Sequence, residues 1–344
     1  MAVYTVLDTN DIVSILRKYD LGTLQRFEAI SSGIENTNYF LWLKSNDQII
    51  TQWVLTIFEN LSESSLPFFN NLTIHLSQKG LAVPAPERMS NGQYVFSILQ
   101  TSQRHANKFG VLVPKFEGAS IDFPDEQACQ RVAVFTAEMH NALSDFPDAN
   151  NIQHSFNWCK QLVGELNPLI PEEDLQALNL ALTRYQAYQA LIDECPAGVV
   201  HGDLFRDNVL FENGKISGVI DFYNAGKTAF LFDLAVIAND WAVNFEYLPS
   251  LFSSKGGDIK GLELKNIYDK PKLDALLSAY ESVRPFSDIE KTLWPRLMEL
   301  AAFRFYLSRL KTKYTKGYQQ EAKEGEVIKS PDAMKIIMLA AMER

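Results

Sequence analysis

The sequence has few cysteines, no excess of basic residues and no long apolar run, and each absence excludes a class of protein. Its three cysteines, Cys129, Cys159 and Cys195, are widely spaced and odd in number, which argues against a disulfide framework and against a zinc site. A net charge of -10 over 344 residues offers no basic field to nucleic acid or to an anionic membrane. This charge is still compatible with an anionic ligand that a divalent cation neutralises.

The apolar segments indicate neither a signal peptide nor a membrane span. The N-terminus, MAVYTVLDTNDIV, lacks a charged region followed by an apolar stretch. The longest apolar candidate, residues 336–342, is much shorter than the roughly 20 residues that a membrane-spanning helix needs. We therefore expect a cytoplasmic protein that binds neither nucleic acid nor membrane. Its oligomeric state, monomer or dimer, is left open.

Strand patterns dominate the first third of the chain. Strands are expected at 26–33, 37–44, 49–59, 93–99 and 110–116. The turn SNDQ joins the second and third of them into a hairpin, and one helix is predicted around 65–79, ending at Gly80. These patterns predict a small, mostly antiparallel sheet with one inserted helix.

Helical patterns prevail after this sheet. Residues 125–143 and 172–192 each align apolar side chains on one face, and Ser287 with Glu290 predicts a capping box. The sequence therefore predicts an α+β fold with two lobes. The expected parts are a β-rich lobe, a connecting segment and a larger, mostly α-helical lobe, at residues 1–112, 113–118 and 119–344.

One segment, VVHGDLFRDNVLFENGKISGVIDFYNAG at 199–226, places ionisable and amide side chains between apolar strands. A buried carboxylate is costly unless a metal ion or a proton compensates its charge. Asp203 and Asn208 are 208 − 203 = 5 residues apart, and an Asn-Gly turn then closes a hairpin that brings Asp221 back towards Asn208. We expect these three side chains to converge at one end of the hairpin.

Their chemistry is that of phosphoryl transfer. Asp203 can accept a proton from an attacking hydroxyl or orient that hydroxyl, and Asn208 and Asp221 offer the hard oxygen atoms that Mg²⁺ prefers. The spacing is that of the catalytic and metal-binding loops of kinases. His201 is the second catalytic candidate, although orienting the loop is its favoured role, and His140 is expected to pack under this loop.

The segment HGDLFRDNVLF…GVIDFYNAG resembles the aminoglycoside phosphotransferase and choline kinase superfamily, which has a two-lobed, protein-kinase-like fold. GIENTNYF at 33–40 and FDLAVIANDW at 232–241 make the chain similar, more narrowly, to the bacterial homoserine kinases of that superfamily. The resemblance implies transfer of the γ-phosphoryl group of ATP to the hydroxyl of L-homoserine, a step of threonine biosynthesis. It implies Asp203 as the catalytic aspartate, and Asn208 and Asp221 as ligands of Mg²⁺.

The same resemblance implies an ATP site in the first lobe. A loop between the first two strands would cover the phosphates, and the hinge at 113–118 would meet adenine. The candidate ATP-binding residues are Gly33, Ile34, Glu35, Asn36, Thr37, Asn38, Val113, Lys115 and Phe116. Many members of the superfamily carry a lysine on the third strand, paired with a helix glutamate. Here Thr56 takes the place of that lysine and the helix has no acidic residue, so loop amides, Mg²⁺ and Lys44 are expected to neutralise the phosphates.

A small zwitterion such as homoserine needs an acceptor for its ammonium group and a donor for its carboxylate. The candidate substrate-binding residues are Tyr223, Asn239, Asp240, Trp241 and Arg304. An aspartate and an arginine carry the right charges for an amino acid. An internal salt bridge between two helices is an equal alternative for any one of these charged residues.

Two other functions are left open. The chain could be a kinase of another small alcohol, such as an aminoglycoside, choline or methylthioribose, although GIENTNYF and the Asn-Asp-Trp segment weigh against it. It could instead be an inactive, kinase-like binding module, an idea that rests on the missing strand lysine. The presence of both Asp203 and Asp221 argues against that second alternative.

Overall fold

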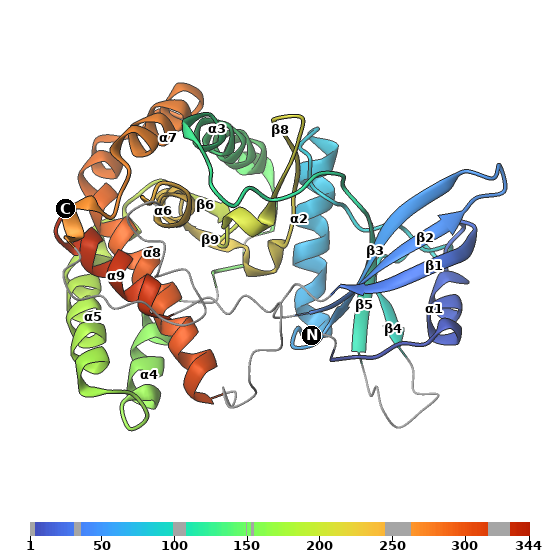
Figure 1. The fold of residues 1–344 in the computed structure, drawn as a ribbon, viewed down its shortest axis with the longest axis horizontal. Coiled ribbons are helices and arrows are strands. Elements are labelled where there is room, and N and C mark those ends of the chain that lie inside the picture. Colours follow the sequence, from blue (N-terminus) through green and yellow to red (C-terminus); the bar gives the residue numbers. More distant parts are fainter. Residues whose placement is uncertain are drawn as a thin grey trace. The chain divides into compact units, whose positions relative to one another are not determined.

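The chain folds into two compact units, residues 1–117 and 118–344 (Figure 1). The computed structural model describes residues 4–30, 36–98, 108–148, 150–152, 155–244, 263–315 and 331–344. The division between the units lies inside the segment 113–118. A hinge role for that segment stays a prediction.

A five-stranded antiparallel sheet forms the first unit, as the sequence predicts. Its strands and helices are α1 (Thr9–Leu16), β1 (Thr23–Ile30), β2 (Thr37–Lys44), β3 (Ile50–Phe58), α2 (Leu66–Gln78), β4 (Phe96–Ile98) and β5 (Lys108–Pro114), with a 3₁₀ turn, η1 (Glu63–Ser65), before α2. The strand order is β1-β2-β3-β5-β4. Strand β1 begins earlier than predicted because its ladder continues to the end of β2, where Thr23 pairs with Lys44.

The core of this unit lies on one face of the sheet. Side chains of a strand alternate between the two faces, so the odd-numbered residues of β2 and β3 share one side. On that side Leu41, Leu55 and Ile57 are fully buried, together with Ile12 of α1. The even-numbered residues, among them Thr56, therefore point to the opposite face.

The second unit is mostly helical. Its helices are α3 (Glu126–Ala142), α4 (Phe156–Leu166), α5 (Glu172–Asp193), α6 (Leu231–Trp241), α7 (Lys270–Val283), α8 (Asp288–Thr315) and α9 (Pro331–Met342), and its 3₁₀ turns are η2 (Leu143–Asp145), η3 (Arg206–Asn208), η4 (Phe222–Asn224) and η5 (Leu264–Asn266). Two short antiparallel pairs complete it: β6 (Ala197–Val200) with β9 (Gly226–Ala229), and β7 (Val209–Glu212) with β8 (Lys215–Val219). The predicted capping box before α8 is present, since Ser287 N–H donates to Glu290 at 2.9 Å. Among the described helices, none is both long and apolar enough to cross a membrane.

Helix α6 lies at the centre of the second unit, and every one of its residues is buried. Helix α8 packs against it and against α4, α5 and α9, while α3 packs against α7 (Figure 1). Three of the buried residues of α6 are polar: Asp233, Asn239 and Asp240. Buried polar groups need hydrogen-bond partners, and the partners of these three define the candidate site described below.

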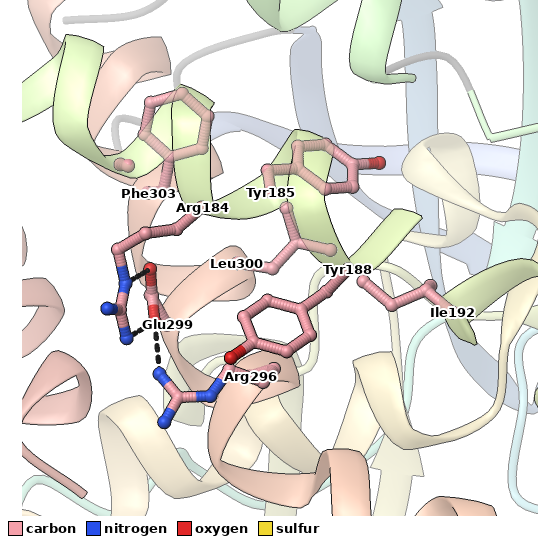
Figure 2. Close-up of a pocket in the computed structure, with 9 residues that line it drawn as sticks. Arg184, Tyr185, Tyr188, Ile192, Arg296, Glu299, Leu300 and Phe303 are labelled. Carbon is pink, nitrogen blue, oxygen red and sulfur yellow. Dashed lines mark hydrogen bonds and ion pairs between the residues drawn. The ribbon is translucent and has the colours of Figure 1, made fainter. Parts of the chain in front are cut away.

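A crevice between α5 and α8 holds a cluster of three charges (Figure 2). Glu299 accepts from Arg184 at 2.6 and 2.9 Å and from Arg296 at 2.9 Å. Its side chain is only 6% exposed, and the guanidinium of Arg296 also lies 5.4 Å from the ring centroid of Tyr188. Because one buried carboxylate serves two arginines, this cluster ties α5 to α8.

Replacing that carboxylate tests its contribution to stability. We expect Glu299→Gln to lower the free energy of unfolding by about 1–3 kcal/mol, because two arginines then lose their charge partner in a largely buried place. The matched control is Asp274→Asn, which breaks the exposed Lys270–Asp274 pair on α7 and is expected to cost less than about 0.5 kcal/mol. Urea denaturation followed by circular dichroism measures both. Equal losses of unfolding free energy in the two variants would show that the buried Glu299 cluster contributes no more to stability than an exposed ion pair does.

Candidate active site

The segment from His201 to Asn208, here called the HGD loop, connects β6 to β7 and carries the first two predicted site residues. The side-chain amide of Asn208 donates to the Asp203 carbonyl at 2.8 Å and to Asp203 Oδ2 at 3.2 Å. The amide of Phe205 also donates to the Asp203 carbonyl, at 2.8 Å. The structure therefore brings Asp203 and Asn208 into direct contact and orients the carboxylate of Asp203.

The hairpin β7–β8 brings the backbone that carries Asp221 next to that of Asn208. Its turn contains Asn213 and Gly214, both with positive φ, as a tight hairpin turn requires. At the open end of the hairpin, Ile220 N–H donates to the Asn208 carbonyl at 3.0 Å, so Asp221 comes directly after the residue bonded to Asn208. Asp221 has φ 65° and ψ 59°, a left-handed conformation that costs free energy in a residue other than glycine.

The HGD loop is anchored by a carboxylate on α6. Asp233 is fully buried and accepts from the His201 amide at 2.8 Å and from the Gly202 amide at 2.7 Å. His140 contacts the same carboxylate at 3.1 Å. Charge-assisted hydrogen bonds to backbone amides are strong in such a buried place, so they determine where the loop, and with it Asp203, lies.

His201 links the two halves of the site. Its Nδ1 accepts from the Asp203 amide at 3.2 Å and its Nε2 donates to the Ile220 carbonyl at 2.9 Å, which assigns the ring proton to Nε2. Burial lowers the pKa of His201 below its ordinary value of 6.5, so the ring is neutral. With both nitrogens occupied by the backbone, the imidazole spans from the amide of Asp203 to the carbonyl that precedes Asp221.

The Asn-Asp-Trp segment at the end of α6 also faces the HGD loop. Asp240 accepts from the Arg206 amide at 2.8 Å and from its guanidinium at 3.0 Å. The indole of Trp241 donates to the Leu204 carbonyl at 3.1 Å, and Asn239 donates to a carbonyl of α8 at 2.8 Å. The polar atoms of these three predicted substrate-binding residues are thus bonded to the chain itself. Their contact with a substrate stays a prediction.

Arg304 lies behind the loop. It is 3% exposed, donates to the Gly202 carbonyl at 3.4 Å, and has its guanidinium 4.9 Å from the ring centroid of Phe232. Burial lowers its pKa to about 10, although the negative charge of Asp203 opposes that shift. The salt bridge that Asp240 forms goes to Arg206 and not to Arg304. Tyr223, in the turn after Asp221, is half-buried.

The predicted phosphate loop is described only in part. Gly33, Ile34 and Glu35 lie outside the described residues, whereas Asn36 and Thr37 are buried. Asn38 pairs with Thr56 across the β2–β3 ladder. The other three candidates lie around the end of β5, where Val113 pairs with Val54, the Lys115 amide donates to the Gln52 carbonyl at 3.1 Å, and Phe116 is half-buried. ATP binding by these residues stays a prediction.

Thr56 has a specific partner. Its hydroxyl donates to the side-chain oxygen of Asn38 at 2.7 Å, across the β2–β3 ladder in which the two residues pair. Lys44 lies 44 − 38 = 6 residues from Asn38, at the other end of β2, which is about 20 Å along an extended strand. The expectation that Lys44 assists at the phosphate loop is therefore wrong, because the lysine side chain is too short for that distance.

The oxygen donors near the HGD loop suit a particular kind of metal site. Within the described ranges, no group of three or more His, Cys, Asp or Glu side chains is placed to hold a metal ion. Asn208 uses its amide nitrogen towards Asp203, which directs its amide oxygen away, and Asp221 adds a carboxylate. One amide and one carboxylate fit Mg²⁺ that arrives with a nucleotide, since phosphates and water then supply its other ligands.

The sequence patterns above did not predict a role for Asp233. One acidic residue in the otherwise apolar run FLFDLAVIA does indicate such a role, because a buried carboxylate needs hydrogen-bond donors from elsewhere in the chain. His140 packs under the HGD loop as expected, through its contact with Asp233.

Comparison with known proteins agrees with this geometry. The sequence profile described as "Phosphotransferase enzyme family" matches residues 26–263. The chain is 34% identical over 312 residues to the homoserine kinase of Polaromonas naphthalenivorans (strain CJ2), covering 90% of this chain and 89% of that protein. It is 36% identical over 320 residues to the homoserine kinase of Burkholderia mallei (strain SAVP1), covering 90% of this chain and 88% of that protein.

Solved structures with the same fold are more distant in sequence. The amicoumacin kinase hAmiN, in complex with AMP-PNP, Ca²⁺ and Ami, superposes with a TM-score of 0.67 at 16% identity, covering 98% of this chain and 94% of that one. The GDP complex of a point mutant of an aminoglycoside 2'-phosphotransferase gives a TM-score of 0.56 at 17% identity, covering 97% of this chain and 96% of that one. These similarities show a protein-kinase-like fold, as the sequence predicts.

The tight backbone at Gly202 is the first test of the site. Gly202 has φ +78°, and a Cβ there would meet the Asn224 carbonyl oxygen at 2.6 Å. We expect Gly202→Ala to displace the HGD loop and to lower the catalytic rate by about 100-fold, the usual cost of misplacing a reacting group by about 1 Å. The control is Gly80→Ala, which also has positive φ (+87°) but open space around it. It should lower stability by about 1 kcal/mol without changing the rate.

The buried histidines predict a pH dependence of stability. Burial lowers the pKa of His140 and of His201 below the ordinary value of 6.5, so the unfolded chain takes up protons that the folded chain does not. Stability must then fall as the pH drops through about 6.5 and below. Thermal unfolding between about pH 8 and pH 5.5 measures this slope, and His140→Gln should reduce it. An identical slope in that variant would show that His140 is not held neutral.

Proposed function

Since the chain belongs to the homoserine kinases of the phosphotransferase enzyme family, we propose that it transfers the γ-phosphoryl group of ATP to the hydroxyl of L-homoserine, giving O-phospho-L-homoserine and ADP. The observation that carries this proposal is the identity of 34% and 36% to homoserine kinases over nine-tenths of the chain. The solved structures named for amicoumacin or aminoglycosides share 16–17% of residues and support only the fold.

Asp203 would be the residue that acts on the nucleophile. A carboxylate there can orient the substrate hydroxyl and accept its proton as the phosphoryl group transfers. Asn208 donates to one oxygen of this carboxylate at 3.2 Å, and Asp233 accepts from the amides of the two residues that precede Asp203. The carboxylate is therefore placed before the substrate arrives, which saves reorganisation during the reaction.

Asn208 and Asp221 would hold Mg²⁺, which would neutralise the phosphate charge when it is bound with ATP. The protein's own part is to keep the amide and the carboxylate side by side. The hydrogen bond from Ile220 to Asn208 at 3.0 Å does this through the backbone. His201 would be a positioning residue, because its neutral ring joins the amide of Asp203 to the Ile220 carbonyl.

Nucleotide binding would use the loop that contains residues 33–38 and the segment 113–118. In place of a strand lysine, the Thr56 hydroxyl donates to the Asn38 oxygen at 2.7 Å. That bond leaves the Asn38 amide nitrogen as a donor, so a fixed neutral donor would replace a cation at the phosphates. Loop amides and Mg²⁺ would supply the remaining stabilisation.

The contacts revise the proposed substrate pocket. Asp240, Trp241 and Arg304 are bonded to the HGD loop, so we assign them to positioning that loop, whereas Asn239 is bonded to α8. Tyr223, the other predicted substrate-binding residue, is half-buried and follows Asp221 by two positions. It is the candidate from this set for contact with homoserine.

Substitution of Asp203 is the direct test. We expect Asp203→Asn to lower kcat by about 10²–10⁴-fold with little change in KM for ATP, because only the proton acceptor is lost. The control is Asp274→Asn, an exposed carboxylate of α7 outside the HGD loop, which should keep kcat within about twofold. An ADP-release assay with Mg-ATP and L-homoserine gives both numbers.

Comparator substrates separate the possible outcomes of that assay. D-homoserine, L-serine, choline and kanamycin should not be phosphorylated at a comparable rate. Turnover of choline or kanamycin in preference to L-homoserine would overturn the substrate and keep the kinase chemistry. ATP binding without turnover of any alcohol would overturn both.

A further inference from the structure

A chain of buried hydrogen bonds leads from α7 to the HGD loop. The Tyr280 hydroxyl of α7 lies 2.8 Å from Nδ1 of His140 on α3, and Nε2 of His140 lies 3.1 Å from the Asp233 carboxylate on α6. That carboxylate binds the amides of His201 and Gly202, the two residues before Asp203. The side chains of Tyr280, His140 and Asp233 are at most 1% exposed, so water does not compete for these bonds.

The direction of each bond follows from its chemistry. An ionised carboxylate only accepts, so Nε2 of His140 carries the ring proton and donates it to Asp233. Nδ1 is then the acceptor of the hydrogen bond that the Tyr280 hydroxyl donates. Burial lowers the pKa of His140 and raises the pKa of Tyr280, which keeps both groups in these neutral forms. Tyr280 therefore selects the histidine tautomer that Asp233 needs.

The rings of this chain are held independently of the Tyr280 hydroxyl. Tyr280 stacks on Phe286 with ring centroids 5.3 Å apart and 14° between the planes, and His140 lies 4.6 Å from Phe230. The guanidinium of Arg284 covers Phe230 at 4.4 Å. Removing only the hydroxyl thus leaves these ring contacts in place, removes its interaction with Arg284 and leaves Nδ1 without its donor. The other tautomer of His140 then competes, and that tautomer has no proton for Asp233.

We propose that Tyr280 is a positioning residue for phosphoryl transfer, acting through neutral His140 on the orientation of Asp233 and so on the place of Asp203. This inference rests on the proposed function. It assigns a role in the rate of reaction to a side chain that is three hydrogen bonds away from the HGD loop. The substrates would not touch Tyr280, so binding should be affected much less than turnover.

The test is Tyr280→Phe, compared with Tyr39→Phe. Tyr39 is a buried tyrosine of the first unit whose hydroxyl donates to the Thr5 carbonyl at 2.9 Å and accepts from the Leu7 amide at 2.9 Å. We expect Tyr280→Phe to lower kcat by about 3- to 10-fold, the rate equivalent of one hydrogen bond, with KM for ATP and homoserine within about twofold. Tyr39→Phe should lower the melting temperature without lowering kcat. Equal kcat in the two variants would overturn the proposal.

Variants of His140 test the route. Glutamine can present a side-chain N–H where Nε2 lies, so His140→Gln should retain more activity than His140→Leu. If Tyr280 acts through His140, adding Tyr280→Phe to His140→Leu, which offers the hydroxyl no acceptor, should cause no further loss of kcat. Multiplied losses in the double variant would overturn the route.

Failure of the proposed function is distinguishable from failure of this inference. Wild-type inactivity on L-homoserine counts against the function alone, because the ratio of variant to wild-type rate can be measured on any alcohol that is phosphorylated. Amide hydrogen exchange of the peptide that contains residues 199–205 gives a readout without substrate. We expect faster exchange at Gly202 in Tyr280→Phe than in Tyr39→Phe, and unchanged exchange would overturn the inference.

Discussion

The buried carboxylate of Asp233 is the interaction on which the candidate site depends. It has no exposure to water, and its charge is compensated by two backbone amides of the HGD loop and by His140. Removing those donors would leave an ionised group unsolvated in the core, which is far more costly than any local rearrangement of the loop. The loop is therefore held in one place by the core of the helical unit.

Around that anchor the site is built mainly from backbone contacts. The Ile220 amide bonds to Asn208, its carbonyl accepts from His201, and the next residue is the left-handed Asp221. A carboxylate in a strained backbone conformation persists only when its surroundings determine it, and here the β7–β8 hairpin and the His201 bridge do so. The side chains that would contact Mg²⁺ and substrate are thus positioned by groups that would contact neither Mg²⁺ nor substrate.

In the first unit a neutral hydrogen bond stands at the position where the sequence resemblance implies a strand lysine. A strand lysine paired with a helix glutamate places a charge near phosphates, and neither member is present here. The Thr56–Asn38 hydrogen bond occupies the same pair of strands instead. In the proposed site, a neutral amide donor would interact less strongly with phosphates than a cation does, so the metal and the loop amides would contribute correspondingly more.

The sequence by itself determined the division into a sheet and a helical unit, the hairpin and the set Asp203, Asn208 and Asp221. Strand alternation, the Asn-Gly turn and short spacings are local properties of the chain, so they can be read without coordinates. Only the tertiary structure decided what the long side chains contact. Asp240 meets Arg206, Arg304 meets Gly202, and Asp233 meets the HGD loop across separations of 31 to 102 residues. Such partners follow from helix packing, which no local pattern encodes.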